Sequence, residues 1–188
     1  MTYAWTHSIE AWTVAVTNRP DLVLEAYGAE PLLDHRTFGE AGALQADAYP
    51  ALLFHGQLRD HGAQVVVLES NGWTGSVPEV ARRCSAAGGH FFSVYWNVNA
   101  HGCVTEGKDG VITAKFEVLY PFQPEQLSSE VRPGWALGSP TDLDRAYQDC
   151  LTHLEEQTGV RIQQEWLDER LPTYRIADPA TLYPDPWV

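Results

Sequence analysis

The sequence predicts an α+β fold, in which a central antiparallel sheet has helices at the N-terminus, between strands and near the C-terminus. Two patterns carry this prediction. Residues 90–99 and 111–120 alternate apolar and polar side chains with a period of two, which is typical of strands. Residues 143–154 instead repeat apolar side chains every three or four positions, which is typical of a helix. Because 188 residues can surround one hydrophobic core, we expect a single domain over residues 1–188.

Two helices are expected near the N-terminus. Residues 8–17 place Ile9, Trp12 and Val16 at positions i, i+3 and i+7, which predicts an amphipathic helix. A second, short helix is expected over residues 18–28, because a proline and an aspartate fall in its first turn and a glycine ends it.

The next segments predict a hairpin. Residues 32–49 are ambiguous between helix and strand. Residues 52–58 and 64–69 are rich in β-formers and predict two strands, joined by a turn at residues 59–62 that contains a glycine.

A capping box predicts the start of the next helix. Ser76 can accept a hydrogen bond from the amide of Glu79, while the Glu79 side chain reaches back to the start of the helix. We expect this helix to continue to about Ala87, where Gly88 supplies a left-handed C-terminal residue.

Three strands and a long helix complete the prediction. The strands are residues 90–99, 101–106 and 111–120, and the last two join through a tight turn at residues 108–110. Prolines mark a loop over residues 121–140. Thr141 then caps a helix that ends at Gly159 and whose buried stripe is Leu143, Ala146, Tyr147, Cys150, Leu151 and Leu154.

Alternation assigns the side chains of two strands to two faces of the sheet. The core face is predicted to hold Phe92, Val94, Trp96 and Val98, together with Ile112, Ala114, Phe116 and Val118. The other face is predicted to hold Ser93, Tyr95, Asn97, Asn99 and His101. An antiparallel sheet commonly leaves one face in water, so a solvated face is the simplest interpretation. Asparagine is depleted in strands, however, and the two asparagines favour a role in binding or in holding a neighbouring loop.

A second polar group follows the strand at residues 64–69. Asn71 and Gly72 indicate a turn, because both tolerate a positive φ. Glu69 could act as a general base or as a partner of the Asn97 amide, and Trp73 could plug the core or stack on a ligand. The candidate binding residues are therefore Glu69, Asn71, Trp73, Tyr95, Asn97, Asn99 and His101, and we expect Glu69, Asn71 and Asn97 to lie near one another.

Metal and cofactor sites have little support. The three cysteines are widely spaced and form no C-x-x-C motif. His55 and His61 flank the first predicted hairpin and could meet across it, but no third ligand is indicated. Cys103 lies two residues after His101, so it is a candidate nucleophile, although neighbouring strand residues are more often structural. The spacing of the glycines matches neither a P-loop nor a dinucleotide fingerprint. No metal and no cofactor are predicted.

Charge indicates the kind of partner. The chain has 25 acidic and 12 basic residues, with a net charge of −13. This excess disfavours nucleic acids and anionic membranes, and it favours a basic protein partner. Since the sequence shows neither a signal-peptide pattern nor a long apolar run, a cytoplasmic location is expected.

Several segments resemble an actinobacterial family of unknown function. The similar segments are 65–75 (VVVLESNGWTG), 78–83 (PEVARR), 93–99 (SVYWNVN), 20–28 (PDLVLEAYG) and 158–162 (TGVRI). One departure is Ser70, which stands where the family pattern has proline. The resemblance implies a bacterial, cytoplasmic, single-domain protein and carries over no catalytic residue.

Three classes of function remain open. The first is a protein that acts by binding, as an immunity-type or regulatory partner. The second is a small pathway enzyme with a polar pocket at the Glu69, Asn97 and Asn99 face. The third is a small-molecule sensor that uses the same face.

Overall fold

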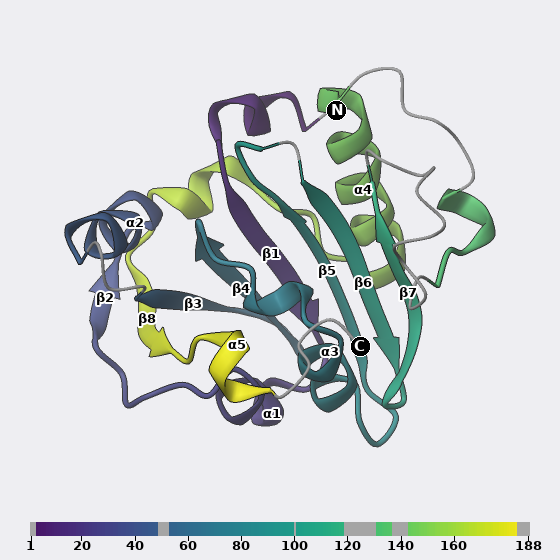
Figure 1. The fold of residues 1–188 in the computed structure, drawn as a ribbon, viewed down its shortest axis with the longest axis horizontal. Helices are drawn as coiled ribbons and strands as arrows, with labels where there is room; N and C mark the ends of the chain where they lie inside the picture. Colours follow the sequence, from purple (N-terminus) through teal and green to yellow (C-terminus); the bar gives the residue numbers. More distant parts are fainter. Residues whose placement is uncertain (1–2, 49–52, 100, 119–130, 137–142, 184–188) are drawn as a thin grey trace.

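The computed structural model describes residues 3–48, 53–99, 101–118, 131–136 and 143–183. This part of the chain forms one sheet of eight antiparallel strands in the order β2-β8-β3-β4-β1-β5-β6-β7 (Figure 1). The predicted α+β class is confirmed. Among the described residues, no helix combines the length and the apolar character that crossing a membrane requires.

The strands are β1 (Trp12–Thr17), β2 (Asp34–Arg36), β3 (Phe54–His61), β4 (Gln64–Ser70), β5 (His90–Trp96), β6 (Gly102–Lys108), β7 (Val111–Glu117) and β8 (Leu171–Ile176). The α-helices are α1 (Pro20–Ala26), α2 (Phe38–Asp47), α3 (Pro78–Cys84), α4 (Leu143–Thr158) and α5 (Pro179–Leu182). Short 3₁₀ helices are η1 (Ala4–Ser8), η2 (Thr74–Ser76), η3 (Gly134–Ala136) and η4 (Gln164–Leu167).

A hydrophobic core lies on each face of the sheet. On one face, here called the α4 face, buried residues of α4 and η4 pack on the strands, including Leu151, Leu154 and Trp166. On the other, here called the α3 face, buried residues of α1 and α3 pack on the strands, including Val23 and Val80. Figure 1 shows α4 along one side of the sheet, and α1, α3 and α5 gathered on the other. Burial of apolar surface on both faces is the main stabilising contribution.

The predicted helix over residues 8–17 is wrong. Residues Trp12–Thr17 form β1, which lies between β4 and β5 near the middle of the sheet. All six residues of β1 are buried, so both faces of the strand pack against apolar neighbours. A strand buried on both sides need not alternate in polarity, and the helical spacing of Ile9, Trp12 and Val16 was therefore a coincidence.

The predicted capping box at Ser76 is also wrong. The N-cap of α3 is Val77, and the Ser76 hydroxyl donates to the carbonyl of Trp73 at 2.6 Å because residues 74–76 form η2. The Glu79 side chain instead pairs with Arg83 at 2.9 Å. The helix ends at Cys84, and the left-handed residues come after it, with φ of 51° at Ala87 and 78° at Gly88. A capping box exists elsewhere, on Thr37 and Glu40 at the start of α2.

Local signals predicted the other elements well. The short helix after Asn18 is α1, and Gly28 follows it with a φ of 57°. Strands β6 and β7 join through Asp109 and Gly110, both with positive φ. Strands β3 and β4 pair as predicted, but β3 continues to His61, so residues 59–61 belong to the strand and not to the turn.

The stripe of α4 is confirmed over its described side chains. Leu143 begins this helix, and a left-handed Gly159 follows it. The buried members of the stripe are Ala146, Tyr147, Cys150, Leu151 and Leu154. The expected cap at Thr141 and most of the expected loop over residues 121–140 lie outside the described residues.

Two residues of the predicted core face lie elsewhere. Val98 is 67% exposed, because β5 ends at Trp96. Ile112 packs against the core of the α3 face, because the register between β6 and β7 shifts at Glu106 and Gly107. One extra residue in a strand reverses the faces that follow it. The opposite face is covered at Ser93, which is fully buried, and is exposed at Asn99 and His101.

Candidate functional site

A level row of five side chains crosses five strands on the α3 face. Register pairs Glu69 with Thr13, Thr13 with Tyr95, Tyr95 with Cys103 and Cys103 with Glu117. Directly paired residues of an antiparallel sheet point to the same face. Each of these side chains therefore lies beside the next one across the five strands. Glu69 and Thr13 are fully buried, whereas Tyr95, Cys103 and Glu117 are half-buried.

Glu69 is the fully buried residue at the β4 end of this row. Its Oε2 accepts the amide of Thr74 at 2.9 Å and its Oε1 accepts the amide of Gly75 at 2.8 Å. Burial raises the pKa of Glu69 to about 7, although the two amides oppose this shift. The loop approaches so closely that a Cβ atom at Gly72 would lie 2.6 Å from Oε2. Glu69 is therefore a fixed acceptor for the loop and does not face solvent.

Hydroxyl groups hold the other side of the same loop, residues 71–76. Thr13 Oγ1 donates to the carbonyl of Gly72 at 2.6 Å, Ser93 Oγ to the carbonyl of Gly75 at 2.6 Å, and Thr105 Oγ1 to the carbonyl of Ser76 at 2.9 Å. All three side chains are fully buried. Ser93, predicted to lie on a solvated face, is therefore buried and ties down a neighbouring loop, which was one of the alternatives, whereas Asn99 and His101 of the same predicted face are exposed.

Asn97 organises the turn between β5 and β6. Its Nδ2 donates to the hydroxyl of Tyr95 at 2.7 Å, and its Oδ1 accepts the amides of Asn99 at 2.9 Å and His101 at 3.3 Å. The backbone amide of Asn97 also donates to the carbonyl of His101 at 2.9 Å. These contacts explain why an asparagine follows the strand, since its side chain replaces backbone partners in the turn. The side chains of Asn99 and His101 are exposed.

The seven predicted site residues thus form two groups at one end of the central strands. Glu69 lies near the end of β4, and Asn71 and Trp73 lie in the loop after it, while the other four belong to β5 and its turn. Trp12 pairs with both Ser70 and Trp96, so the two groups lie at the same level with β1 between them. Two strand spacings make about 10 Å, too far for direct contact between Glu69 and Asn97 side chains.

Two members of the loop group have different surroundings. Asn71 is exposed and left-handed, with a φ of 53°, and its carbonyl accepts Gln45 Nε2 at 3.3 Å. Trp73 is half-buried and packs against the core of the α3 face. This packing favours the role in which Trp73 fills the core over the role in which it stacks on a ligand.

Cysteine chemistry is disfavoured by burial. Burial raises the pKa of Cys103 to about 12, and the charge of Glu117 adds to this shift. Burial also raises the pKa of Cys84 and of Cys150 to about 12. The thiolate is the nucleophilic form, so at neutral pH these side chains are unreactive thiols.

The two histidines of the first hairpin do not meet. Both lie on β3, where His55 pairs with Arg175 and His61 pairs with Gln64. The His61 ring lies 5.8 Å from the ring of Trp166. Within the described ranges, no three histidine, cysteine, aspartate or glutamate side chains are grouped so that they could hold a metal ion.

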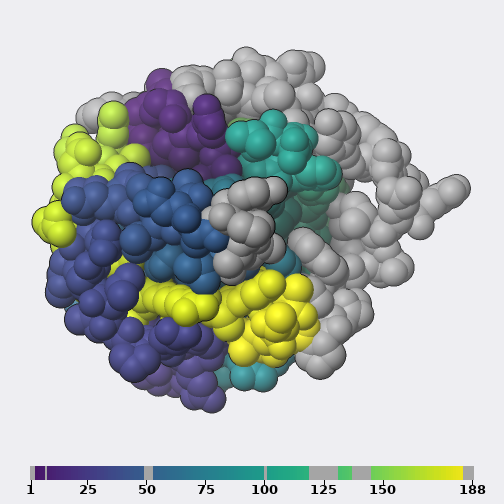
Figure 2. All heavy atoms as spheres, turned by 60° about the vertical axis from the view of Figure 1, so that its left-hand side comes forward, coloured from purple at the N-terminus to yellow at the C-terminus, as the bar shows by residue number. Residues whose placement is uncertain are grey.

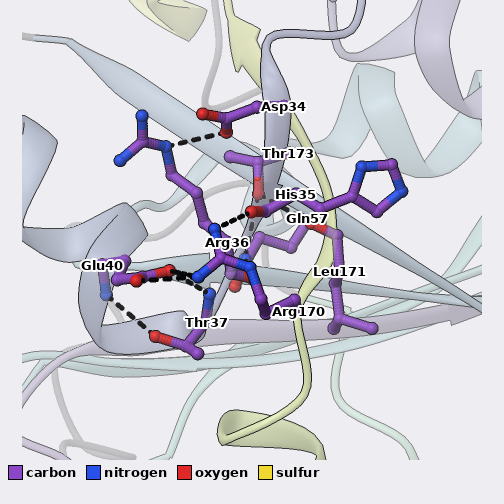
Figure 3. Close-up of polar contacts among 9 residues, drawn as sticks. All are labelled: Asp34, His35, Arg36, Thr37, Glu40, Gln57, Arg170, Leu171 and Thr173. Carbon is purple, nitrogen blue, oxygen red and sulfur yellow. Dashed lines mark hydrogen bonds and ion pairs between the residues drawn. The ribbon is translucent and has the colours of Figure 1, made fainter.

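A polar network beside α2, exposed at Arg170 and Glu40 and buried at Gln57 and Thr173, was not anticipated from the sequence (Figure 3). Arg170 binds both carboxylate oxygens of Glu40, at 2.9 and 3.0 Å, and donates to the carbonyl of His35 at 2.6 Å. Gln57 Nε2 donates to the carbonyl of Arg36 at 2.7 Å and to Thr173 Oγ1 at 3.0 Å. Figure 2 shows this end of the molecule, where α2 and β2 lie beside β8. The network therefore ties the edge strand β2 and the start of α2 to the neighbouring strands β8 and β3.

Side-chain contacts join the β3–β4 hairpin to two segments in the C-terminal third of the chain. Arg59 joins the hairpin to η4, since its guanidinium lies 4.2 Å from the Trp166 ring and pairs with Glu169 at 2.9 Å. Gln64 Nε2 joins the hairpin to the end of α4 through the carbonyl of Thr158 at 2.8 Å. The joined segments carry four exposed carboxylates, here called the acidic end: Asp60 of β3, Glu156 of α4, and Glu165 and Asp168 of η4 and its C-cap.

No family model, curated protein or solved structure matches this chain. The resemblance to an actinobacterial family therefore stays a prediction, and the function is argued from the geometry alone.

Proposed function

We propose that this protein acts by binding a basic protein through the acidic end, in an immunity-type or regulatory role. The observation that carries the proposal is the position of the acids at the end of α4. The last turn of α4 contains no basic residue; its Glu155 pairs with Arg161 at 3.3 Å, and its Glu156 is exposed. The C-terminal end of a helix already bears a partial negative charge, so acids there cost stability. A surface that keeps such residues is suited to attracting positive charge.

The neighbouring acids reinforce this field. Glu165 and Asp168 form no ion pair with any residue that the structure describes. Glu156 has only His153 beside it, at 3.4 Å. With a net charge of −13 on the whole chain, such a surface steers a basic partner and mainly raises its association rate.

The geometry gives less support to the enzyme and sensor alternatives. Both require Glu69 and the turn residues to share an open pocket. Glu69 is fully buried behind the 71–76 loop and uses both carboxylate oxygens on backbone amides. Asn97 uses its side chain on its own turn. These polar groups maintain the fold and are not arranged around a substrate.

The test is a comparison of two charge-reversed double variants as bait. The first is Glu165→Lys with Asp168→Lys, and the matched control is Glu10→Lys with Asp47→Lys, which changes the net charge equally at exposed positions elsewhere. Extract from the source bacterium is passed over each immobilised protein at low salt, and retained proteins are identified by mass spectrometry. We expect the unaltered protein and the control to retain the same basic protein, and the first variant to lose it. Equal retention by both variants contradicts the proposal.

A further inference from the structure

An asparagine and a glycine follow each other directly after β4, at Asn71 and Gly72. Asn71 is exposed, and its side-chain amide forms no hydrogen bond with any residue that the structure describes. Its backbone is left-handed, with a φ of 53°, which is an unfavourable conformation for a residue with a side chain. The Asn71 side chain is therefore free to turn towards its own backbone.

The backbone nitrogen of Gly72 is the group that this side chain meets. It donates to no acceptor in the described part of the chain, whereas the Asn71 nitrogen donates to the carbonyl of Ala11 at 3.0 Å. A glycine has no Cβ atom to hinder approach to its nitrogen. The fold also requires glycine at this position, because a Cβ atom would lie 2.6 Å from Glu69 Oε2. The packing of the loop on Glu69 thus keeps an unhindered nitrogen beside an exposed asparagine.

We propose that Asn71 is a modification site at which the chain deamidates itself. The Gly72 nitrogen attacks the side-chain carbonyl carbon of Asn71, Cγ, and a new C–N bond closes a five-membered imide. The bond from Cγ to Nδ2 breaks, and Nδ2 takes up the proton lost by the Gly72 nitrogen and leaves as ammonia. Water then hydrolyses the imide at either carbonyl, which gives aspartate or isoaspartate. The reaction needs only water, and it changes no oxidation state.

Two hydrogen bonds hold the loop against this reaction. Gln45 Nε2 donates to the carbonyl of Asn71 at 3.3 Å, and Thr13 Oγ1 donates to the carbonyl of Gly72 at 2.6 Å. Ring closure turns the planar peptide group between Asn71 and Gly72, so these contacts open before the nitrogen reaches Cγ. The rate of modification therefore follows local opening of the 71–76 loop.

The product changes the loop that Glu69 holds. In isoaspartate the side-chain carbon enters the main chain, so the segment after β4 becomes one carbon longer. The amides of Thr74 and Gly75, which Glu69 accepts at 2.9 and 2.8 Å, then lose their positions. The new carboxylate also lies two residues from the buried carboxyl of Glu69. Modification at Asn71 therefore loosens the loop and lowers the stability of the protein.

The test follows the folded protein during several weeks near neutral pH at physiological temperature. Mass spectrometry of peptides locates the gain of one mass unit, and an isoaspartyl methyltransferase with a labelled methyl donor detects isoaspartate. We expect both signals at Asn71. Conversion there should be about tenfold faster than at Asn99, which is exposed but is followed by alanine.

Two variants and one control examine the loop contacts. Thr13→Val and Gln45→Ala each remove one of the two hydrogen bonds, and the second places a good helix former in α2. Thr17→Val is the matched control, because Thr17 is buried on the same strand and donates to the carbonyl of Cys84 at 2.7 Å, away from the loop. We expect both loop variants to react about fivefold faster, and the control to keep the original rate. Denaturant unfolding verifies that each variant is folded during the incubation.

Four outcomes overturn the inference. Asn71 that stays unmodified in the folded protein, under conditions that convert the urea-unfolded chain, removes the site. Conversion of Asn99 as fast as Asn71 removes the role of Gly72. Unchanged rates in Thr13→Val and Gln45→Ala show that the loop contacts do not control the reaction. An isolated isoaspartate form that unfolds at the same urea concentration as the unaltered protein contradicts the loosening of the loop.

Discussion

The carboxylate of Glu69 binds the backbone amide of Gly75 at 2.8 Å from within the core of the α3 face. Oxygen Oε1 serves Gly75 and Oε2 serves Thr74, so one buried side chain supplies acceptors to two consecutive amides of the 71–76 loop. Hydroxyls of three strands hold the carbonyls of the same loop. The loop is therefore fixed on its amide side and its carbonyl side at once, and the stability of the protein should depend on Glu69 and on pH.

The first prediction concerns the protonation of Glu69. The pKa of Glu69 is raised by burial to about 7, against 4.5 for an ordinary glutamate, so folding favours the protonated form. The contribution of Glu69 to the free energy of unfolding is fully present below about pH 4.5. It falls by about 3 kcal/mol as the pH rises to about 7. Glu69→Gln does not titrate. Urea unfolding between pH 4 and 8 should show the protein losing stability relative to Glu69→Gln as pH rises. A difference that is constant with pH contradicts this prediction.

The second prediction concerns Gly72. A Cβ atom there would lie 2.6 Å from Glu69 Oε2 and 2.7 Å from Glu69 Cβ, and the surrounding side chains are buried. Gly72→Ala should therefore destabilise the protein by about 1–3 kcal/mol. Gly39→Ala is the matched control, because a Cβ there meets nothing within 4 Å and Gly39 lies in α2. The control should be neutral or slightly stabilising in denaturant unfolding. Similar effects of both substitutions would show that the loop does not pack tightly on Glu69.

The third prediction concerns Glu106, whose carboxylate contacts His90 and Lys108 at 2.9 Å and Thr113 at 2.9 Å. Burial alone would raise its pKa, but the hydrogen bonds from these three partners lower the pKa to about 2. The folded state therefore favours the ionised form. Its contribution is present above about pH 4.5 and is lost as pH falls to about 2.

Glu106→Gln should cost about 1–2 kcal/mol at pH 7, after allowance for solvent screening, and almost nothing at pH 2. Denaturant unfolding at the two pH values measures this difference. A cost that is equal at both values would mean that the charge of Glu106 does not contribute.

These elements show which parts of the fold a sequence can predict. The α4 stripe and the turn at Asp109 and Gly110 were predictable, because their signals come from residues close in the chain. The strand β1 was not, since burial on both faces removes the alternation that marks a strand. The role of Ser93 was also hidden, because its partner is a backbone carbonyl 18 residues away in sequence, on a loop that covers the sheet.

The site was predictable to a similar degree. The unusual asparagine at position 97 correctly indicated a special role, but propensity alone did not separate binding from turn formation. Glu69 was recognised as notable, yet its amide partners depend on how residues 72–76 fold back over the strand. The acidic end joins residues of β3, α4 and η4, so only the overall excess of acids was visible in the sequence.

The fourth prediction separates the two roles of Asn97. Asn97→Ala removes three hydrogen bonds that hold the β5–β6 turn, so it should lower stability by about 1–2 kcal/mol. It should leave capture of the basic partner unchanged, because it lies on another part of the sheet from the acidic end. Thermal unfolding and capture are measured on the same preparation. Lost capture with unchanged stability would instead make Asn97 a recognition residue.

A further prediction concerns reversal of the charges of two acids on α4. The side chains of Asp149 and Glu156 are 72% and 65% exposed. Glu156 belongs to the acidic end, whereas Asp149 stands nearly two helical turns earlier and faces Arg145 at 3.8 Å. Reversal of Glu156 should therefore reduce capture more than reversal of Asp149.

The most direct measurement is the association rate of the captured partner as a function of salt. The Debye length falls from about 10 Å at 0.1 M salt to about 3 Å at 1 M, so steering by the acidic end should disappear over this range. We expect the rate to fall at least tenfold for the unaltered protein and for Glu10→Lys with Asp47→Lys. For Glu165→Lys with Asp168→Lys the rate should start low and change little. A steep salt dependence that survives in this last variant would contradict binding through the acidic end.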